Sequence, residues 1–133
     1  MPSRNRTILC IEDEDLQLKA RRMLFESAVY SVVEATSAIE TISTFRSVPV
    51  DAVVVDYWLS EPGGNGTVAA QEMKRIRPNV PMVILSTFCS LPGDTTVVDS
   101  WMRKGEADPG ILAREVSRLI ELRSSSSQAG AAE

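Results

Sequence analysis

The chain has 133 residues, 44% of them hydrophobic and 24% charged, which is the balance of one soluble globular domain with a single core. The formal net charge of −4 and the lack of a Lys/Arg stripe argue against direct DNA binding, and no apolar run approaches the ~18 residues of a membrane span. There is no histidine, which excludes Ser-His and Cys-His nucleophile pairs and the commonest zinc ligand.

Two cysteines, Cys10 and Cys89, form no CxxC motif. We expect both to be small core residues rather than redox centres. A chain without a disulfide framework is typical of a reducing compartment, so the expected location is the cytoplasm.

Short apolar runs and amphipathic segments alternate through the first half of the chain. The pattern predicts strands at 7–11, 30–35 and 51–56. A helix over about 15–28 carries apolar residues at i, i+4, i+7 and i+8, namely Leu16, Ala20, Met23 and Leu24. Ser37 and Glu40 form a capping box for a second helix, whose apolar residues are Ile39, Ile42 and Phe45.

The same alternation continues in the second half. A helix carrying Ala69, Met73 and Ile76 ends before Pro78, and strands follow at 81–86 and 97–102. Asp108 and Pro109 are typical of an N-cap and a first helical position. The last helix has an apolar face made of Ile111, Leu112, Val116, Leu119 and Ile120. We predict an N-terminal extension at 1–5, one domain at 6–123, and a disordered Ser-rich tail at 124–133, which has too little apolar surface to order itself.

Five strands alternating with helices predict an α/β fold, with a doubly wound five-stranded parallel sheet and helices on both of its faces. In such folds the functional crevice lies beyond the carboxyl ends of the strands. The search for a site can therefore be confined to the residues that end each strand.

Polar side chains gather at those strand ends. The first strand is followed by Glu12, Asp13 and Glu14, the third ends in Asp56, the fourth ends in Ser86 and Thr87, and the fifth is followed by Arg103 and Lys104. Several carboxylates in one place repel one another unless a cation compensates them, and oxygen-only ligands suit Mg²⁺. Lys104 and Ser86 are expected to contact Asp56 or a group bonded to it. The turn after the first strand, "IEDEDLQ", has no glycine, which argues against a nucleotide or flavin site.

In this order, and each at a strand end, these residues resemble the CheY-like receiver domain of two-component response regulators, over about residues 6–122. The family's acidic pair matches Glu12 and Asp13, and its phosphoacceptor matches Asp56. Its strand-four hydroxyl, its lysine and its aromatic switch position match Ser86, Lys104 and Trp101 respectively.

The resemblance implies strand order 2-1-3-4-5 and a phosphoryl group transferred to Asp56 from a sensor histidine kinase or a phosphotransfer protein. It implies Mg²⁺ held by Glu12, Asp13, Asp56 and the backbone carbonyl of Trp58. Lys104 would neutralise charge on the transferring oxygens, and Ser86 and Trp101 would respond to the phosphoryl group. Such a domain catalyses only its own phosphorylation and dephosphorylation, so it is not expected to be an enzyme.

Three departures from the family pattern carry further expectations. The loop after Asp56, "YWLSEPGGNG", holds about two extra residues, and Gly105 stands where a cis-proline usually follows the lysine. The segment between Ser86 and Lys104 is about one helical turn short and contains Pro92-Gly93, so the family's fourth helix is expected to be short or irregular. We expect Trp58 to shield the mouth of the site and the bulk of Thr87 to slow dephosphorylation.

The reading that combines these features is a stand-alone, cytoplasmic response regulator of bacterial type. It would be a monomer or weak homodimer that signals to an unidentified downstream protein. One alternative is a degenerate receiver that binds proteins independently of phosphorylation. A less favoured alternative is a Mg²⁺-dependent phosphatase, which would need a second Asp two residues after the nucleophile, where this chain has Trp58.

Overall fold

A five-stranded parallel sheet forms the centre of the molecule. The computed structural model describes residues 6–57, 66–86, 98–103 and 109–132. Its strands are β1 (Thr7–Ile11), β2 (Ser31–Ala35), β3 (Ala52–Asp56), β4 (Met82–Ser86) and β5 (Ser100–Arg103). They are ordered β2-β1-β3-β4-β5 and all pair in parallel, which confirms the predicted order.

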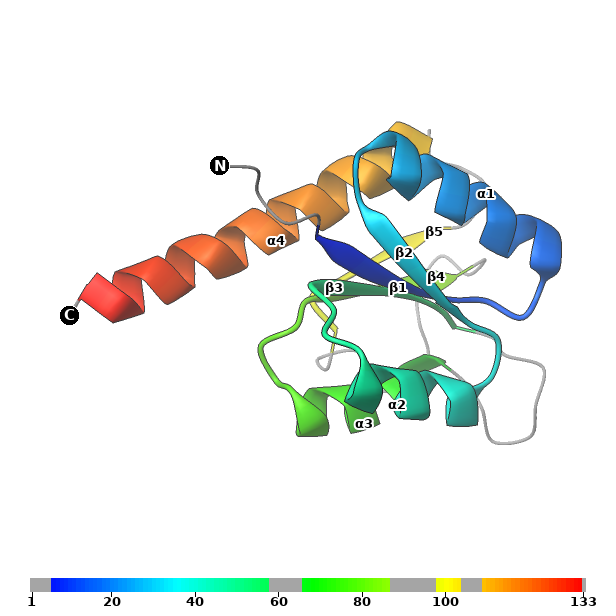
Figure 1. Ribbon diagram of the computed structural model, residues 1–133, viewed down its shortest axis with the longest axis horizontal. Helices are drawn as coiled ribbons and strands as arrows, with labels where there is room; N and C mark the ends of the chain where they lie inside the picture. Colours follow the sequence, from blue (N-terminus) through cyan, green and yellow to red (C-terminus); the bar gives the residue numbers. More distant parts are fainter. Residues whose placement is uncertain (1–5, 58–65, 87–97, 104–108, 133) are drawn as a thin grey trace.

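Four helices in the described part of the chain cover the two faces of this sheet. They are α1 (Asp15–Ser27), α2 (Ala38–Ser47), α3 (Gly66–Ile76) and α4 (Pro109–Ala132). Helices α1 and α4 lie over one face, and α2 and α3 lie over the other (Figure 1). The predicted doubly wound α/β fold is therefore confirmed.

The alternation of side chains along each strand divides the core into two layers. On β3, Val53 and Val55 pack with α2 and α3, whereas Val54 packs with α1 and α4. Every residue of β3 and β4 is buried, which is why both read as unbroken apolar runs in the sequence. Ile11 pairs with Val55 at the ends of β1 and β3, so the residues that follow emerge at the same edge.

Most predicted strands agree with the structure within a residue or two. The fifth strand differs more, because it spans Ser100–Arg103 rather than 97–102. Asp99 directly precedes this strand, and its carboxylate accepts hydrogen bonds from the Met82 amide and from Lys74 Nζ, both at 2.8 Å. The segment 87–97, predicted to hold a short or irregular helix, lies outside the described residues.

The apolar stripe predicted for the first helix was largely wrong, because only Leu24 of its four residues packs against the core. Leu16 and Met23 are 79% and 68% exposed, and Ala20 is exposed as well. The buried face instead carries Leu18, Arg21 and Phe25. The spacing i, i+3, i+7 is as helical as the predicted one, and an arginine inside the stripe concealed it.

The predicted N-cap of α2 is present, and the reciprocal hydrogen bond of Glu40 is made to the residue before the cap rather than to the cap itself. The Ser37 hydroxyl accepts a hydrogen bond from the Glu40 amide at 3.1 Å, and the Glu40 carboxylate accepts one from the Thr36 amide at 2.6 Å. Of the three apolar residues expected on this helix, Phe45 is fully buried, Ile42 packs at the edge of the core, and Ile39 is 80% exposed.

Helix α4 begins at Pro109, as predicted, and buries four of its five expected apolar residues, Leu112, Val116, Leu119 and Ile120. Ile111 is 41% exposed. The prediction of a disordered tail from residue 124 differs from the structure, in which α4 continues to Ala132. Extending a helix that is already nucleated by a packed segment does not repeat the cost of nucleation.

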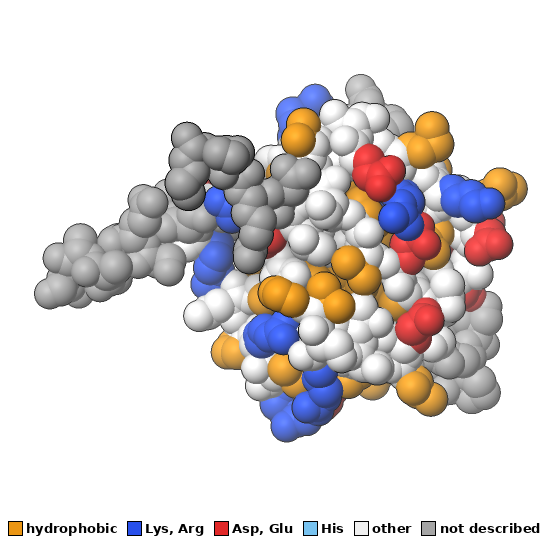
Figure 2. Space-filling view, in the orientation of Figure 1, with side chains coloured by type: hydrophobic (Ala, Val, Ile, Leu, Met, Phe, Trp, Pro, Cys, Tyr) orange, Lys and Arg blue, Asp and Glu red, His pale blue; other side chains and the backbone are white. Residues whose placement is uncertain are grey.

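The surface carries both signs of charge. On the face shown in Figure 2, acidic and basic side chains are interspersed with hydrophobic ones, in keeping with the small net charge of −4. No helix within the described ranges combines the length and the apolar character needed to cross a membrane.

The end of α1 holds the only non-glycine residue with positive φ in the described ranges. Val29 has φ of 69°, and the Val29 and Tyr30 amides bond back to the carbonyls of Glu26 and Phe25 at 3.0 Å. This position after a helix favours glycine, because a β-branched side chain there clashes with the backbone. Val29 is also 70% exposed, so its side chain gains little from packing.

We therefore expect Val29→Gly to raise the free energy of unfolding by about 1 kcal/mol, since it removes this clash. Urea denaturation at equilibrium measures the change. Ala20→Gly, at an exposed position inside the same helix, is the matched control and should lower stability by about 1 kcal/mol. A loss of stability in Val29→Gly would show that its conformation is not strained.

Cys10 is fully buried in β1, as expected, whereas Cys89 lies outside the described residues. Burial raises the pKa of the Cys10 thiol from 9.0 to about 12, against an opposing effect of the Arg21 charge.

In a Cys89→Ser variant, we expect the native protein to resist a thiol-specific disulfide reagent at pH 8 and to react fully in denaturant. The stabilisation from the neutral thiol is complete below pH 9.0 and falls as the pH rises toward 12. Rapid reaction of the folded variant would contradict this burial.

A candidate metal and phosphoacceptor site

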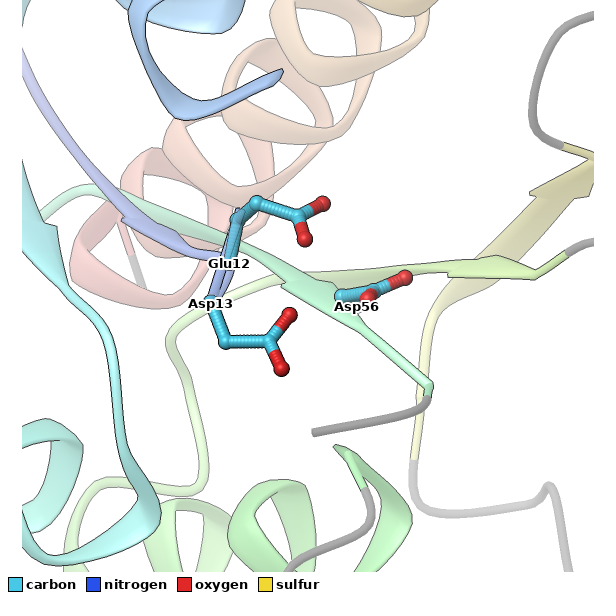
Figure 3. Close-up of side chains that lie close together, drawn as sticks. All are labelled: Glu12, Asp13 and Asp56. Atoms are coloured by element: carbon cyan, nitrogen blue, oxygen red, sulfur yellow. The ribbon is translucent and has the colours of Figure 1, made fainter. Parts of the chain in front are cut away.

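Three carboxylates meet at the edge where β1 and β3 end. Glu12 and Asp13 follow β1, and Asp56 is the last residue of β3. One oxygen from each lies within 4.8 Å of the others. Figure 3 shows the side chains of Glu12 and Asp13 extending toward the side of Asp56. The convergence predicted from the strand ends is therefore present for these three residues.

Backbone hydrogen bonds fix the turn that carries Glu12 and Asp13. The Glu12 amide donates to the Ala35 carbonyl at 3.1 Å, which extends the pairing of β1 with β2 by one residue. The Glu14 amide donates to Glu12 Oε2 at 3.2 Å. Glu12 is 1% exposed, so this carboxylate is held inside the protein rather than at its surface.

Asp56 is positioned by the centre of the sheet. It pairs with Leu85 of β4, and the amide of Tyr57 donates to the Leu85 carbonyl at 2.8 Å. Asp56 is only 4% exposed. A carboxylate buried to this degree needs hydrogen bonds or a cation around it, because desolvation of a charge is costly.

The structure adds a residue that the sequence analysis missed. Arg21 of α1 places Nη1 2.9 Å from Glu12 Oε1, and the two side chains are 9% and 1% exposed. The signal that could have identified Arg21 is its spacing from Leu18 and Phe25, which places it on the buried face of α1. A buried arginine in an otherwise apolar stripe requires an acidic partner.

The remaining predicted site residues fall into two groups. Ser86, 1% exposed, ends β4 one residue after the partner of Asp56, and Trp101 lies partly buried in β5 against the core. Lys104, Trp58 and Thr87 lie outside the described residues. Their expected roles therefore stay predictions.

The donor set suits a hard divalent cation. Glu12, Asp13 and Asp56 offer oxygen ligands alone, and Asp13 is partly exposed, which leaves a route for a hydrated ion. Mg²⁺ prefers such ligands and keeps several of its waters. The residues present therefore fit Mg²⁺, which would also relieve the repulsion among the three carboxylates.

Comparison with known proteins supports the family suggested by the sequence. The model of the response regulator receiver domain matches residues 8–102. The chain belongs to this family. The matched range contains Glu12, Asp13, Asp56, Ser86 and Trp101. No curated protein sequence matches the chain.

Solved receiver structures share the fold at low sequence identity. A CheY-like receiver domain protein from Methanospirillum hungatei JF-1 has a TM-score of 0.83 at 18% identity, covering 92% of this chain and 99% of its own. A receiver protein from Sinorhizobium medicae WSM419 has a TM-score of 0.77 at 26% sequence identity, covering 90% of this chain and 97% of its own. Response regulator TrrA from Thermotoga maritima, solved in complex with Mg²⁺-BeF, has a TM-score of 0.77 at 21% identity, covering 86% of this chain and 98% of its own.

Neutralising one carboxylate of the cluster should stabilise the metal-free receiver. We expect Asp13→Asn to raise the free energy of unfolding in EDTA by about 1 kcal/mol, since it removes repulsion between like charges. The same variant should lose the stabilisation that Mg²⁺ gives the wild type, as measured by thermal unfolding with and without the ion.

Glu121→Gln, an exposed charge change on α4, is the control and should leave both quantities unchanged. Equal Mg²⁺ stabilisation of Asp13→Asn and the wild type would show that Asp13 is not a ligand of the ion.

Proposed function

We propose that this receiver accepts a phosphoryl group on Asp56 in a Mg²⁺-dependent reaction and signals through protein–protein contacts. The observation that carries the proposal is the cluster of Glu12, Asp13 and Asp56 within 4.8 Å at the carboxyl edge of the sheet. Membership of the receiver family supports the same role. The donor would be a phosphohistidine on a sensor kinase or on a phosphotransfer protein.

In the proposed transfer, a carboxylate oxygen of Asp56 attacks the phosphorus of the phosphohistidine. The P–N bond breaks, the imidazole of the donor leaves with its electron pair, and Asp56 becomes an acyl phosphate. Mg²⁺, when bound, would supply charge neutralisation at the transferring oxygens. Glu12, Asp13, Asp56 and the Trp58 carbonyl are the proposed residues that hold it.

The proposed response begins at residues around the acyl phosphate. Lys104 would pair with a phosphoryl oxygen, and the Ser86 hydroxyl would donate a hydrogen bond to another. Trp101 would then change its packing on β5, which transmits the new charge to the surface that a downstream protein reads. Hydrolysis of the acyl phosphate would return the domain to its resting state, at a rate that Thr87 modulates.

A phosphorylation-independent binding module is the second candidate. The observation that favours it is the Arg21–Glu12 ion pair, which already places a positive charge beside the acidic cluster. A pocket whose negative charge is partly compensated by the protein has less need of a metal ion. The alternative is therefore decided by whether Asp56 can be phosphorylated at all.

Intact-mass spectrometry after incubation with a small phosphodonor and Mg²⁺ tests the proposal. We expect the wild type to gain the mass of one phosphoryl group and Asp56→Asn to gain none, because the amide is a far weaker nucleophile than the carboxylate. EDTA should abolish the gain in the wild type.

Asp15→Asn is the matched control, because Asp15 is an exposed carboxylate in the first turn of α1 and lies outside the cluster. It should gain the phosphoryl group as the wild type does. No gain on any variant would favour the phosphorylation-independent module. Steady release of phosphate from simple esters without an adduct would instead indicate a phosphatase.

A further inference from the structure

The sheet-facing side of α1 carries a charged residue in an otherwise apolar setting. Arg21 is 8% exposed, and its neighbours on that face, Leu18 and Phe25, are 4% and 0% exposed. Both neighbours belong to the core layer between the sheet and helices α1 and α4. Burying a guanidinium at such a position carries a considerable desolvation cost, which a nearby acidic partner must offset.

The charge of Arg21 is directed at the acidic cluster. Nη1 lies 2.9 Å from Glu12 Oε1, while Nη2 donates to Gln17 Oε1 at 3.4 Å. Within the described ranges, Nη1 makes no hydrogen bond of good geometry, so the contact with Glu12 is an ion pair rather than an aligned fork. The other Glu12 oxygen accepts from the Glu14 amide at 3.2 Å.

We propose that Arg21 is a resident counter-cation that positions Glu12 and lowers the affinity of the acidic cluster for Mg²⁺. This inference rests on the proposed function, because it assigns the cluster a metal ion. Arg21 is a positioning residue in this account, since it contacts neither the ion nor the phosphoryl group.

Two physical effects act in the same direction. The guanidinium repels a dication that enters beside Glu12, and the buried position of the pair limits screening by solvent and salt. The ion pair also holds Glu12 Oε1, so the ion must compete with Arg21 for that carboxylate. The metal-free domain is stabilised by Arg21, and the gain from binding Mg²⁺ is correspondingly smaller.

Calorimetric titration of the full chain with Mg²⁺ tests the proposal. Arg21→Met retains much of the length of the side chain without its charge, and we expect it to bind Mg²⁺ about tenfold more tightly than the wild type. Its melting temperature should fall in EDTA and recover with Mg²⁺. Arg21→Lys keeps the charge and should bind Mg²⁺ with nearly the affinity of the wild type.

Arg22→Met is the matched control. Arg22 is the next residue of α1, but its side chain is 43% exposed and pairs with Glu26 and Glu34 at the surface. The Arg22→Met substitution makes the same change in net charge, but away from the cluster. The Mg²⁺ affinity of this variant should therefore remain that of the wild type. Tightening in Arg22→Met equal to that in Arg21→Met would reduce the effect to net charge and overturn the proposal.

A second pair of variants keeps the test decisive if Arg21→Met does not fold. Glu12→Gln with Arg21→Met removes both charges and should bind Mg²⁺ more tightly than Glu12→Gln alone. The proposal would be overturned if Arg21→Met bound Mg²⁺ no more tightly than the wild type, or if the double variant bound it no more tightly than Glu12→Gln. A wild type that binds no Mg²⁺ and forms no adduct would contradict the proposed function, whereas Mg²⁺ binding gained in Arg21→Met would still support the role of Arg21.

Discussion

The mutual repulsion of Glu12, Asp13 and Asp56 is the constraint on which the rest of the site depends. The sheet brings these carboxylates within 4.8 Å of one another, and two of the three are almost completely buried. Such a group is unfavourable without positive charge nearby. In the proposed function, this unfavourable arrangement would be relieved by a bound cation, which would in turn favour the approach of a phosphoryl group.

Helix α1 supplies positive charge beside the cluster. Its Arg21 forms a nearly completely buried ion pair with Glu12, which directly follows β1. Any change in the charge of the cluster therefore acts on α1 as well as on β3. On the other side of Asp56, the pairing of β3 with β4 brings Ser86, the last residue of β4, to the same edge of the sheet. The site is thus connected to both halves of the sheet.

The sequence predicted the parts of this structure that depend on one-dimensional patterns. Unbroken apolar runs identified β3 and β4, the Ser37–Glu40 spacing identified the start of α2, and carboxylates at the strand ends identified the cluster. The buried face of α1 was missed because two helical stripes compete there, and the true one contains Arg21. The partner of an arginine depends on tertiary packing, which a pattern along one helix does not contain. The continuation of α4 to Ala132 was missed for a related reason, since the packed part of the helix supplies the nucleus for the tail.

The most direct measurement is a crystal structure of the chain grown with Mg²⁺ and beryllofluoride. Our account predicts one ion coordinated by Asp13 and Asp56 with Glu12 beside it, and beryllofluoride bonded to the Asp56 carboxylate. Lys104 should then contact a fluorine atom. An ion bound away from these carboxylates, or an unmodified Asp56 at saturating concentrations of both reagents, would contradict the account.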